Sequence, residues 1–164
     1  MLTYTLEAEL LVPVSTDQAF EVFENPYNLA RITPPWLNFK ILTEGLQMKR
    51  GAEIDYEFRW LGVPMRWKTV ITEYDPPFGF VDKALKSPYV LWHHRHTFRK
   101  EDEGTMVGDR IDYILPFGPF GQAIHSLVVA NQLKQIFDYR QKAIIELLGG
   151  TASEIRPPTI TARK

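Results

Sequence analysis

The chain has no cysteine among its 164 residues. Disulfides, thiolate metal sites and cysteine nucleophiles are therefore excluded. It also lacks a phosphate-binding loop, a nucleophile elbow, a dinucleotide fingerprint and a zinc-protease motif. No motif of the sequence points to a cofactor, and we expect none.

An excess of charge of one sign is also missing, since 19 basic and 20 acidic residues leave a net charge of −1. Without a dense Lys/Arg cluster, the sequence argues against nucleic-acid binding. No basic region followed by an apolar run opens the chain, and no apolar stretch approaches membrane-spanning length. We expect a cytoplasmic protein without membrane insertion, and the oligomeric state stays open.

What is present is a single-domain length and many aromatic rings. A chain of 164 residues is long enough to bury a real core. Hydrophobic residues make up 45% of it and aromatic residues 13%. Such an aromatic excess either lines a pocket or fills a wide core.

The pattern of the N-terminal part predicts a strand, two short helices and a second strand. Residues 3–12 have the period-two pattern of a half-buried strand. A short helix follows, with Ser15 or Thr16 as its N-cap. The pattern then predicts a second short helix over 26–32 and a strand over 36–43.

The clearest hairpin spans residues 53–70, with its turn at Leu61-Gly62. One register pairs aromatic side chains on one face and opposite charges on the other. A slip of one residue would spoil both faces. The predicted partners are Trp60–Val63, Phe58–Met65, Tyr56–Trp67, Ile54–Thr69, Glu57–Arg66 and Asp55–Lys68.

The second half contains a strand over 78–85, a long hairpin within 87–116 and a helix over 120–148. Strands followed by one long helix indicate α+β architecture, with a twisted sheet curled around the helix. Residues 1–148 form the predicted domain. Residues 149–164 are a polar tail that either stays loose or docks as an extended segment.

Particular residues resemble a known superfamily. The segments that carry the resemblance are Phe80-Val81-Asp82, Lys86-Ser87-Pro88-Tyr89, Trp92-His93-His94-Arg95-His96-Thr97-Phe98, Gly104-Thr105, Asp109-Arg110-Ile111-Asp112-Tyr113 and Leu115-Pro116-Phe117-Gly118. They are similar to a bacterial subgroup of the SRPBCC, or START-like, superfamily that is labelled polyketide cyclase/dehydrase-like or ligand-binding. The resemblance covers roughly residues 1–148.

The resemblance implies the helix-grip fold, with two short helices after the first strand and about seven strands wrapped around the C-terminal helix. It also implies a cavity for a lipid, polyketide or aromatic compound, with Trp36 near its entrance. It implies no particular reaction, because members of this superfamily differ in function.

Alternation places His94 and His96 on the inner face of the first strand of the 87–116 hairpin. With a turn at Asp102-Glu103, His96 faces Asp109 across the hairpin. Such a pair orients an imidazole and raises its pKa. It acts as a general base, anchors a ligand, or only braces two strands.

Two further interpretations involve the same face. In an enzyme, Tyr113 would polarise a carbonyl while His96 moves a proton. A metal ion held by His94, His96 and Asp109 is the less favoured alternative, and we expect no metal.

The sequence therefore predicts a protein that binds a hydrophobic or amphipathic small molecule. The alternative is a cofactor-independent cyclase or dehydratase with His96, Asp109 and Tyr113 as catalytic residues. The expected ligand-binding residues are Trp36, Tyr56, Phe58, Trp67, Trp92, His94, His96 and Tyr113.

Overall fold

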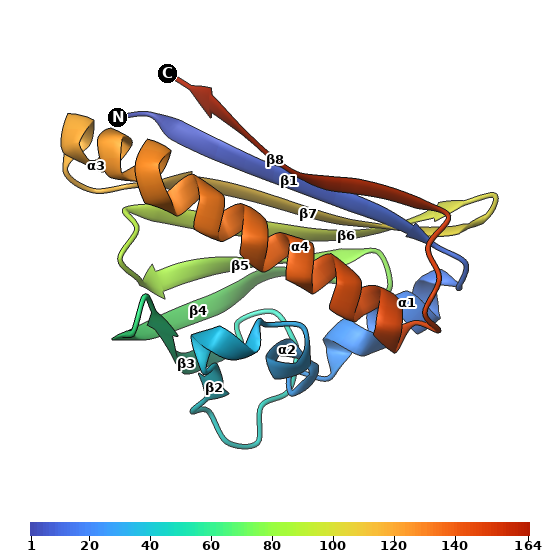
Figure 1. Cartoon of the computed structure of the whole chain (residues 1–164). Coiled ribbons are helices and arrows are strands. Elements are labelled where there is room, and N and C mark those ends of the chain that lie inside the picture. The colour runs from blue at the N-terminus through green and yellow to red at the C-terminus, as the bar shows by residue number, and fades with distance from the viewer.

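A computed structural model, which describes residues 1–164, contains one curved antiparallel sheet packed against one long helix (Figure 1). The strand order is β2-β3-β4-β5-β6-β7-β1-β8. The strands are β1 (Thr3–Val12), β2 (Lys40–Ile41), β3 (Glu53–Trp60), β4 (Val63–Asp75), β5 (Gly79–Lys86), β6 (Leu91–Glu101), β7 (Gly104–Ile114) and β8 (Glu154–Arg163).

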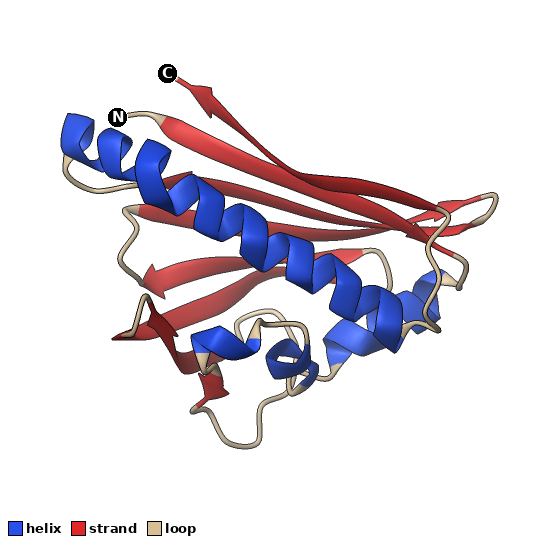
Figure 2. Ribbon diagram, in the orientation of Figure 1, coloured by secondary structure: helices blue, strands red, loops and turns tan.

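The long helix is a continuous rod across one face of the sheet (Figure 2). It comprises α3 (Gly118–Ile124), a π-helical turn η2 (His125–Val129) and α4 (Ala130–Leu147). The smaller helices α1 (Thr16–Glu24), α2 (Asn28–Arg31) and η1 (Pro35–Leu37) come between β1 and β2. Ser15 caps α1 through a capping box with Gln18, as a serine before a helical pattern predicts.

The β3–β4 hairpin has the register that its sequence predicts. Tyr56 lies opposite Trp67, and Glu57 lies opposite Arg66. On the charged face, Lys68 Nζ lies 2.7 Å from a carboxylate oxygen of Glu53 and 3.8 Å from one of Asp55. The aromatic side chains Tyr56, Phe58 and Trp67 lie on the other face, which the long helix covers.

The β6–β7 hairpin also has the predicted register. His96 lies opposite Asp109, His94 opposite Ile111, and the two-residue turn is Asp102-Glu103. Its outer face carries solvated ion pairs such as Arg95 with Glu73 and Arg110 with Glu7. The inner side chains of this hairpin therefore point to the helix side of the sheet.

The polar tail docks as an extended segment, which is one of the two arrangements expected of it. Residues 154–163 pair with β1 as β8, so the sheet has eight strands. Pro157 and Pro158 argue against a strand, yet they fall where the β1–β8 register shifts, at a sheet edge where missing N–H donors are tolerated. The strand expected over 36–43 shrinks to β2, because Pro35 begins the helical turn η1.

The core between sheet and helices has two apolar clusters. The larger contains 14 buried residues, among them Phe20, Phe80 and Ile144. The smaller contains seven, among them Ile111 and Phe137. His96 stacks on Phe80 with ring centroids 4.0 Å apart, while the His94 ring lies 5.7 Å from that of Phe137. Polar side chains thus lie where the two clusters meet.

Gln141 links the long helix to the two strands at one edge of the sheet. Its buried amide donates to the carbonyls of Glu9 and Arg156, each at 3.0 Å. We expect Gln141→Ala to lower the free energy of unfolding by about 1–3 kcal/mol in urea denaturation, because two hydrogen bonds are lost. Gln135→Ala, at an exposed position of the same helix, is the control. Equal effects of the two substitutions would contradict this role of Gln141.

Candidate functional site

A cavity of about 390 Å³ lies between the sheet and the long helix. Of its 35 lining residues, 24 are hydrophobic, so an apolar molecule matches most of its surface. Volumes above about 300 Å³ are typical of small-molecule sites. Aromatic rings form much of the wall: Phe23, Phe39, Tyr56, Phe58, Trp60, Trp67, Phe80, Tyr89, Trp92, Phe117 and Phe137.

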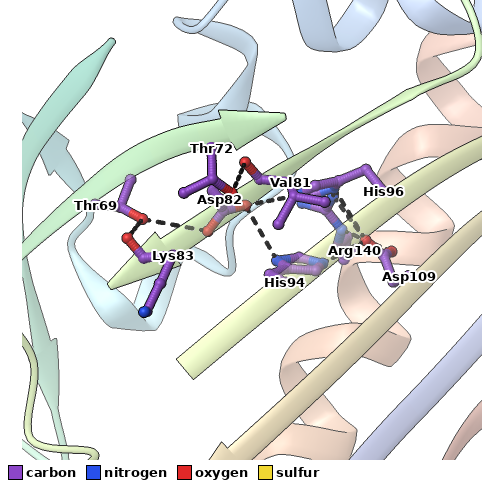
Figure 3. A network of polar contacts seen from close by, with 9 residues as sticks. All are labelled: Thr69, Thr72, Val81, Asp82, Lys83, His94, His96, Asp109 and Arg140. Carbon is purple, nitrogen blue, oxygen red and sulfur yellow. Dashed lines mark hydrogen bonds and ion pairs between the residues drawn. The ribbon is translucent and has the colours of Figure 1, made fainter. Parts of the chain in front are cut away.

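One part of the wall is polar, and four elements contribute to it (Figure 3). His96 of β6 donates from Nε2 to Asp82 Oδ2 of β5 at 2.6 Å. His94 donates from Nε2 to Asp109 Oδ1 of β7 at 2.8 Å. Arg140 of α4 donates to both carboxylate oxygens of Asp109, at 3.0 and 3.1 Å. We call Asp82, His94, His96, Asp109 and Arg140 the polar network.

Strand pairing explains why these side chains meet. Asp82 lies opposite His94, and His96 lies opposite Asp109, in adjacent antiparallel pairs. Directly opposed residues share one face of a sheet, so β5, β6 and β7 direct their polar side chains to the same side. Arg140 reaches this face from the helix above it.

Charges inside the network determine the protonation of its members. Burial raises the pKa of Asp109, but Arg140 and the two histidines outweigh it and hold that pKa well below its ordinary value. The pKa of Asp82 is also lowered, because nearby His94 and His96 outweigh its desolvation. Both carboxylates are therefore ionised at neutral pH.

The two histidines behave differently. Burial and the neighbouring His96 lower the pKa of His94 to about 4. Burial also lowers the pKa of His96, but hydrogen bonds to Asp109 and Asp82 outweigh it, and the pKa is raised overall. With His96 protonated, two carboxylates, one guanidinium and one imidazolium cancel in charge.

His96 has two alternative partners for its second nitrogen. When the ring is neutral, Nδ1 accepts from Arg140 Nη2 at 3.3 Å. When it is protonated, Nδ1 faces Asp109 Oδ1 at 3.4 Å. Either state leaves the ring with polar partners, so His96 can exchange a proton at the cavity wall.

The predicted His96–Asp109 pair is thus part of a larger arrangement. The two residues are opposed as expected, but the shortest bond of His96 goes to Asp82. Asp109 is bound chiefly by His94 and Arg140 and lies behind the cavity wall. Of the network, Asp82, His94, His96 and Arg140 line the cavity.

Tyr113 is buried but does not line the cavity, contrary to its expected place there. Its hydroxyl is bonded to His125 Nε2 at 2.7 Å, and the His125 ring stacks on Tyr4 with centroids 3.6 Å apart. Burial raises the pKa of Tyr113 and lowers that of His125. Tyr113 therefore braces the start of the long helix against the sheet instead of facing a ligand.

Trp36 also lies outside the cavity lining. It is 54% exposed and packs edge-on against Tyr139 of the long helix. The other expected ligand-binding residues do line the cavity: Tyr56, Phe58, Trp67, Trp92, His94 and His96. Trp67 Nε1 is the one buried side-chain polar atom without a hydrogen-bond partner in the protein.

Ligand atoms for a metal ion are present in Asp82, His94 and His96, which offer donors within 4.8 Å of one another. The carboxylate in this group of possible metal ligands is that of Asp82, whereas the sequence suggested Asp109. In the structure these donors bind one another, and His96 is only 2.6 Å from Asp82. An ion would have to break that bond.

The sequence by itself assigned no role to Asp82 or Arg140, although the sequence pattern places both of them on inner faces. Asp82 follows the inward-facing Phe80 by two residues, so alternation puts it on the inner face. Arg140 follows Leu133 and Phe137 at helical spacing on the apolar side of α4. A charge in such a stripe needs a buried partner.

Comparisons with solved structures agree with this architecture, whereas no protein-family model and no curated protein matches the sequence. The protein TTHA0849 from Thermus thermophilus aligns with a TM-score of 0.71 and 15% identity over 88% of this chain and 96% of that one. Ara h 8.0201 aligns with a TM-score of 0.62 and 14% identity, over 88% of this chain and 99% of that one.

A norcoclaurine synthase from Thalictrum flavum aligns with a TM-score of 0.63 and 16% identity, over 88% of this chain and 95% of that one. The chain has the helix-grip fold, in which a curved antiparallel sheet wraps around a long C-terminal helix. In this helix-grip protein the long helix and the curved sheet enclose the cavity, and the polar network spans the two layers. At these identities the likeness concerns the fold alone.

Breaking the buried Arg140–Asp109 ion pair is expected to lower stability strongly. Asp109→Asn leaves a buried guanidinium without its counter-charge, which costs about 3–5 kcal/mol of unfolding free energy. Asp112→Asn, on the outer face of the same strand, is the matched control and is expected to cost less than about 1 kcal/mol. Chemical denaturation measures both, and a larger loss for Asp112→Asn would refute the assignment.

The pKa values of the two histidines of the network should lie on opposite sides of the ordinary histidine value. We expect NMR to find the His94 ring still neutral at pH 5, with a pKa of about 4, and the His96 ring titrating above its ordinary value of 6.5. Between pH 6.5 and 4 the unfolded chain protonates His94 and the folded chain does not, so His94 lowers stability as the pH falls. His96 contributes stability that is complete below pH 6.5 and is lost as the pH rises through its folded pKa. A His94 ring that titrates near 6.5 would contradict the described network.

Proposed function

We propose that this protein binds a hydrophobic or amphipathic small molecule, of lipid, polyketide or aromatic type, in the cavity between the sheet and the long helix. The observation that carries the proposal is the cavity of about 390 Å³, with a mostly apolar lining and one polar wall. An amphipathic ligand would place its apolar part among the aromatic rings. Its polar group would then meet Asp82, His94 and His96.

The aromatic wall supports a ligand with rings or flat unsaturated parts. Trp67 lies in a chain of ring contacts, 6.1 Å from Tyr56 and 5.2 Å from Trp92 between centroids. Rigid rings hold a cavity open and offer faces for stacking. We propose Tyr56, Phe58, Trp67 and Trp92 as ligand-contacting residues.

A second candidate is a cofactor-independent cyclase or dehydratase. It is favoured by His96, a cavity-lining imidazole with a raised pKa whose Nε2 donates to the carboxylate of Asp82. Asp82 would take the place expected for Asp109, and Tyr113 would have no part. The norcoclaurine synthase with the same fold, determined in complex with a transition-state analogue, is an enzyme. For this candidate, His96→Gln should abolish turnover while ligand binding persists.

Ligand binding is tested with the neutral apolar dye N-phenyl-1-naphthylamine, whose fluorescence rises in an apolar site. We expect saturable binding by the wild type, and at least about tenfold weaker binding by Ile136→Trp, because the larger ring occupies the cavity. Ile155→Trp, on the exposed part of β8, is the matched control.

Both variants are checked for folding by their thermal unfolding midpoints, so that loss of binding is not loss of structure. Equal dye binding by Ile136→Trp and the wild type would place the dye outside the cavity. No saturable binding of this dye or of a set of fatty acids, polyketides and polycyclic aromatics would overturn the proposal.

A further inference from the structure

One end of the molecule combines large exposed apolar side chains with an absence of charge. From residue 113 to residue 133 the sequence has no Asp, Glu, Lys or Arg. Within this segment Phe117, Phe120 and Leu127 are 80%, 79% and 81% exposed. Exposed apolar side chains that gather in one patch mark an interaction surface, whereas isolated ones are ordinary.

Two other segments bring apolar tips to the same end. The β3–β4 turn exposes Leu61 and Val63, and the β5–β6 loop exposes Val90. Figure 1 shows this turn, this loop and α3 together at the left end of the molecule. We call Leu61, Val63, Val90, Phe117, Phe120 and Leu127 the apolar rim.

The rim surrounds an entrance to the cavity. Residues beside each of its three parts line the same cavity: Trp60 in β3, Pro88 in the β5–β6 loop and Phe117 before α3. Pro88 and Phe117 are exposed as well as cavity-lining, so the cavity reaches the surface there. The exposed apolar surface and the apolar interior are therefore continuous.

The charges that flank the rim are mostly basic, although Glu57 lies opposite Arg66. Arg59 and Arg66 lie on either side of the β3–β4 tip, and Lys86 precedes the β5–β6 loop. All three are exposed, and none forms an ion pair in the structure. This local excess of positive charge stands out in a chain with a net charge of −1.

We propose that this end of the protein docks on the surface of an anionic lipid bilayer, with the apolar rim at the boundary between headgroups and acyl chains. Apolar side chains that enter this boundary and nearby cations that contact lipid phosphates are the two contributions to peripheral membrane binding. The helices themselves do not span a bilayer, since none is both long and apolar enough.

Charge favours lipid over a second copy of the chain as the occupant. In a two-fold dimer the same surface patch faces itself, so Arg59, Arg66 and Lys86 would approach the same cations of the other copy. An anionic bilayer neutralises them instead. Docking would bring the cavity entrance against the lipid, so that an apolar ligand passes between the two without crossing water. This use of the surface rests on the proposed ligand binding, whereas the docking itself does not.

The test is sedimentation of the full chain with vesicles of phosphatidylcholine, alone or mixed with phosphatidylglycerol. We expect binding to the mixed vesicles that weakens with salt, and at least about tenfold weaker binding by Phe120→Ser/Leu127→Ser. Neither residue lines the cavity, so dye binding by this variant should stay unchanged. Arg59→Gln/Arg66→Gln should remove the preference for anionic vesicles.

The matched control is Phe78→Ser/Ile155→Ser, which removes two exposed apolar side chains. Phe78 belongs to the β4–β5 turn and Ile155 to the start of β8, and both elements lie at the opposite end of the sheet (Figure 1). This control should bind vesicles like the wild type. The proposal would be overturned if the wild type did not bind vesicles, or if both double variants lost vesicle binding to the same extent.

A second outcome would also overturn it. If the wild type were a dimer without vesicle binding, and Phe120→Ser/Leu127→Ser made it a monomer, the rim would be a contact between two copies of the chain. Vesicle binding without saturable binding of the dye or of any compound in the ligand set would support docking and refute the cavity's proposed role.

Discussion

The buried ion pair between Arg140 and Asp109 is the contact on which the inner face of this protein depends. It joins the long helix to the sheet through two hydrogen bonds between buried side chains. Because a buried carboxylate is costly without a partner, Asp109 requires Arg140, and the reverse holds equally. Asp109 also accepts a hydrogen bond from His94, so the ion pair helps to orient the first histidine.

From this pair the polar network extends to the cavity. His96 continues it to Asp82, which lies on the wall where two apolar clusters meet. Each member satisfies its neighbour, which is the condition under which polar groups are tolerated inside a core. The result is a mostly apolar cavity with one charged but internally neutralised wall. Such a wall can receive one polar group of an otherwise apolar ligand.

The two ends of the molecule differ in how far their apolar side chains are covered. At one end α1 and the last turns of α4 close the larger apolar cluster against the sheet. At the other, three chain segments leave apolar side chains in solvent around the cavity entrance. If the cavity binds an apolar ligand as proposed, this difference favours ligand entry from an apolar phase at the α3 end.

Local pattern by itself determined the β3–β4 and β6–β7 hairpins and the long helix. Alternation and opposite charges specify the β3–β4 register, because a slip by one residue exchanges the two faces, and the same logic opposed His96 to Asp109. Only the tertiary structure decided which buried groups touch. Arg140 meets Asp109 because the helix crosses β7, and Tyr113 turns to His125 instead of the cavity. Likewise, β8 forms because β1 offers an open edge, which compensates for the weak strand pattern of residues 154–163. Contacts between distant elements depend on how layers pack, and that information is spread over the whole chain instead of any one segment.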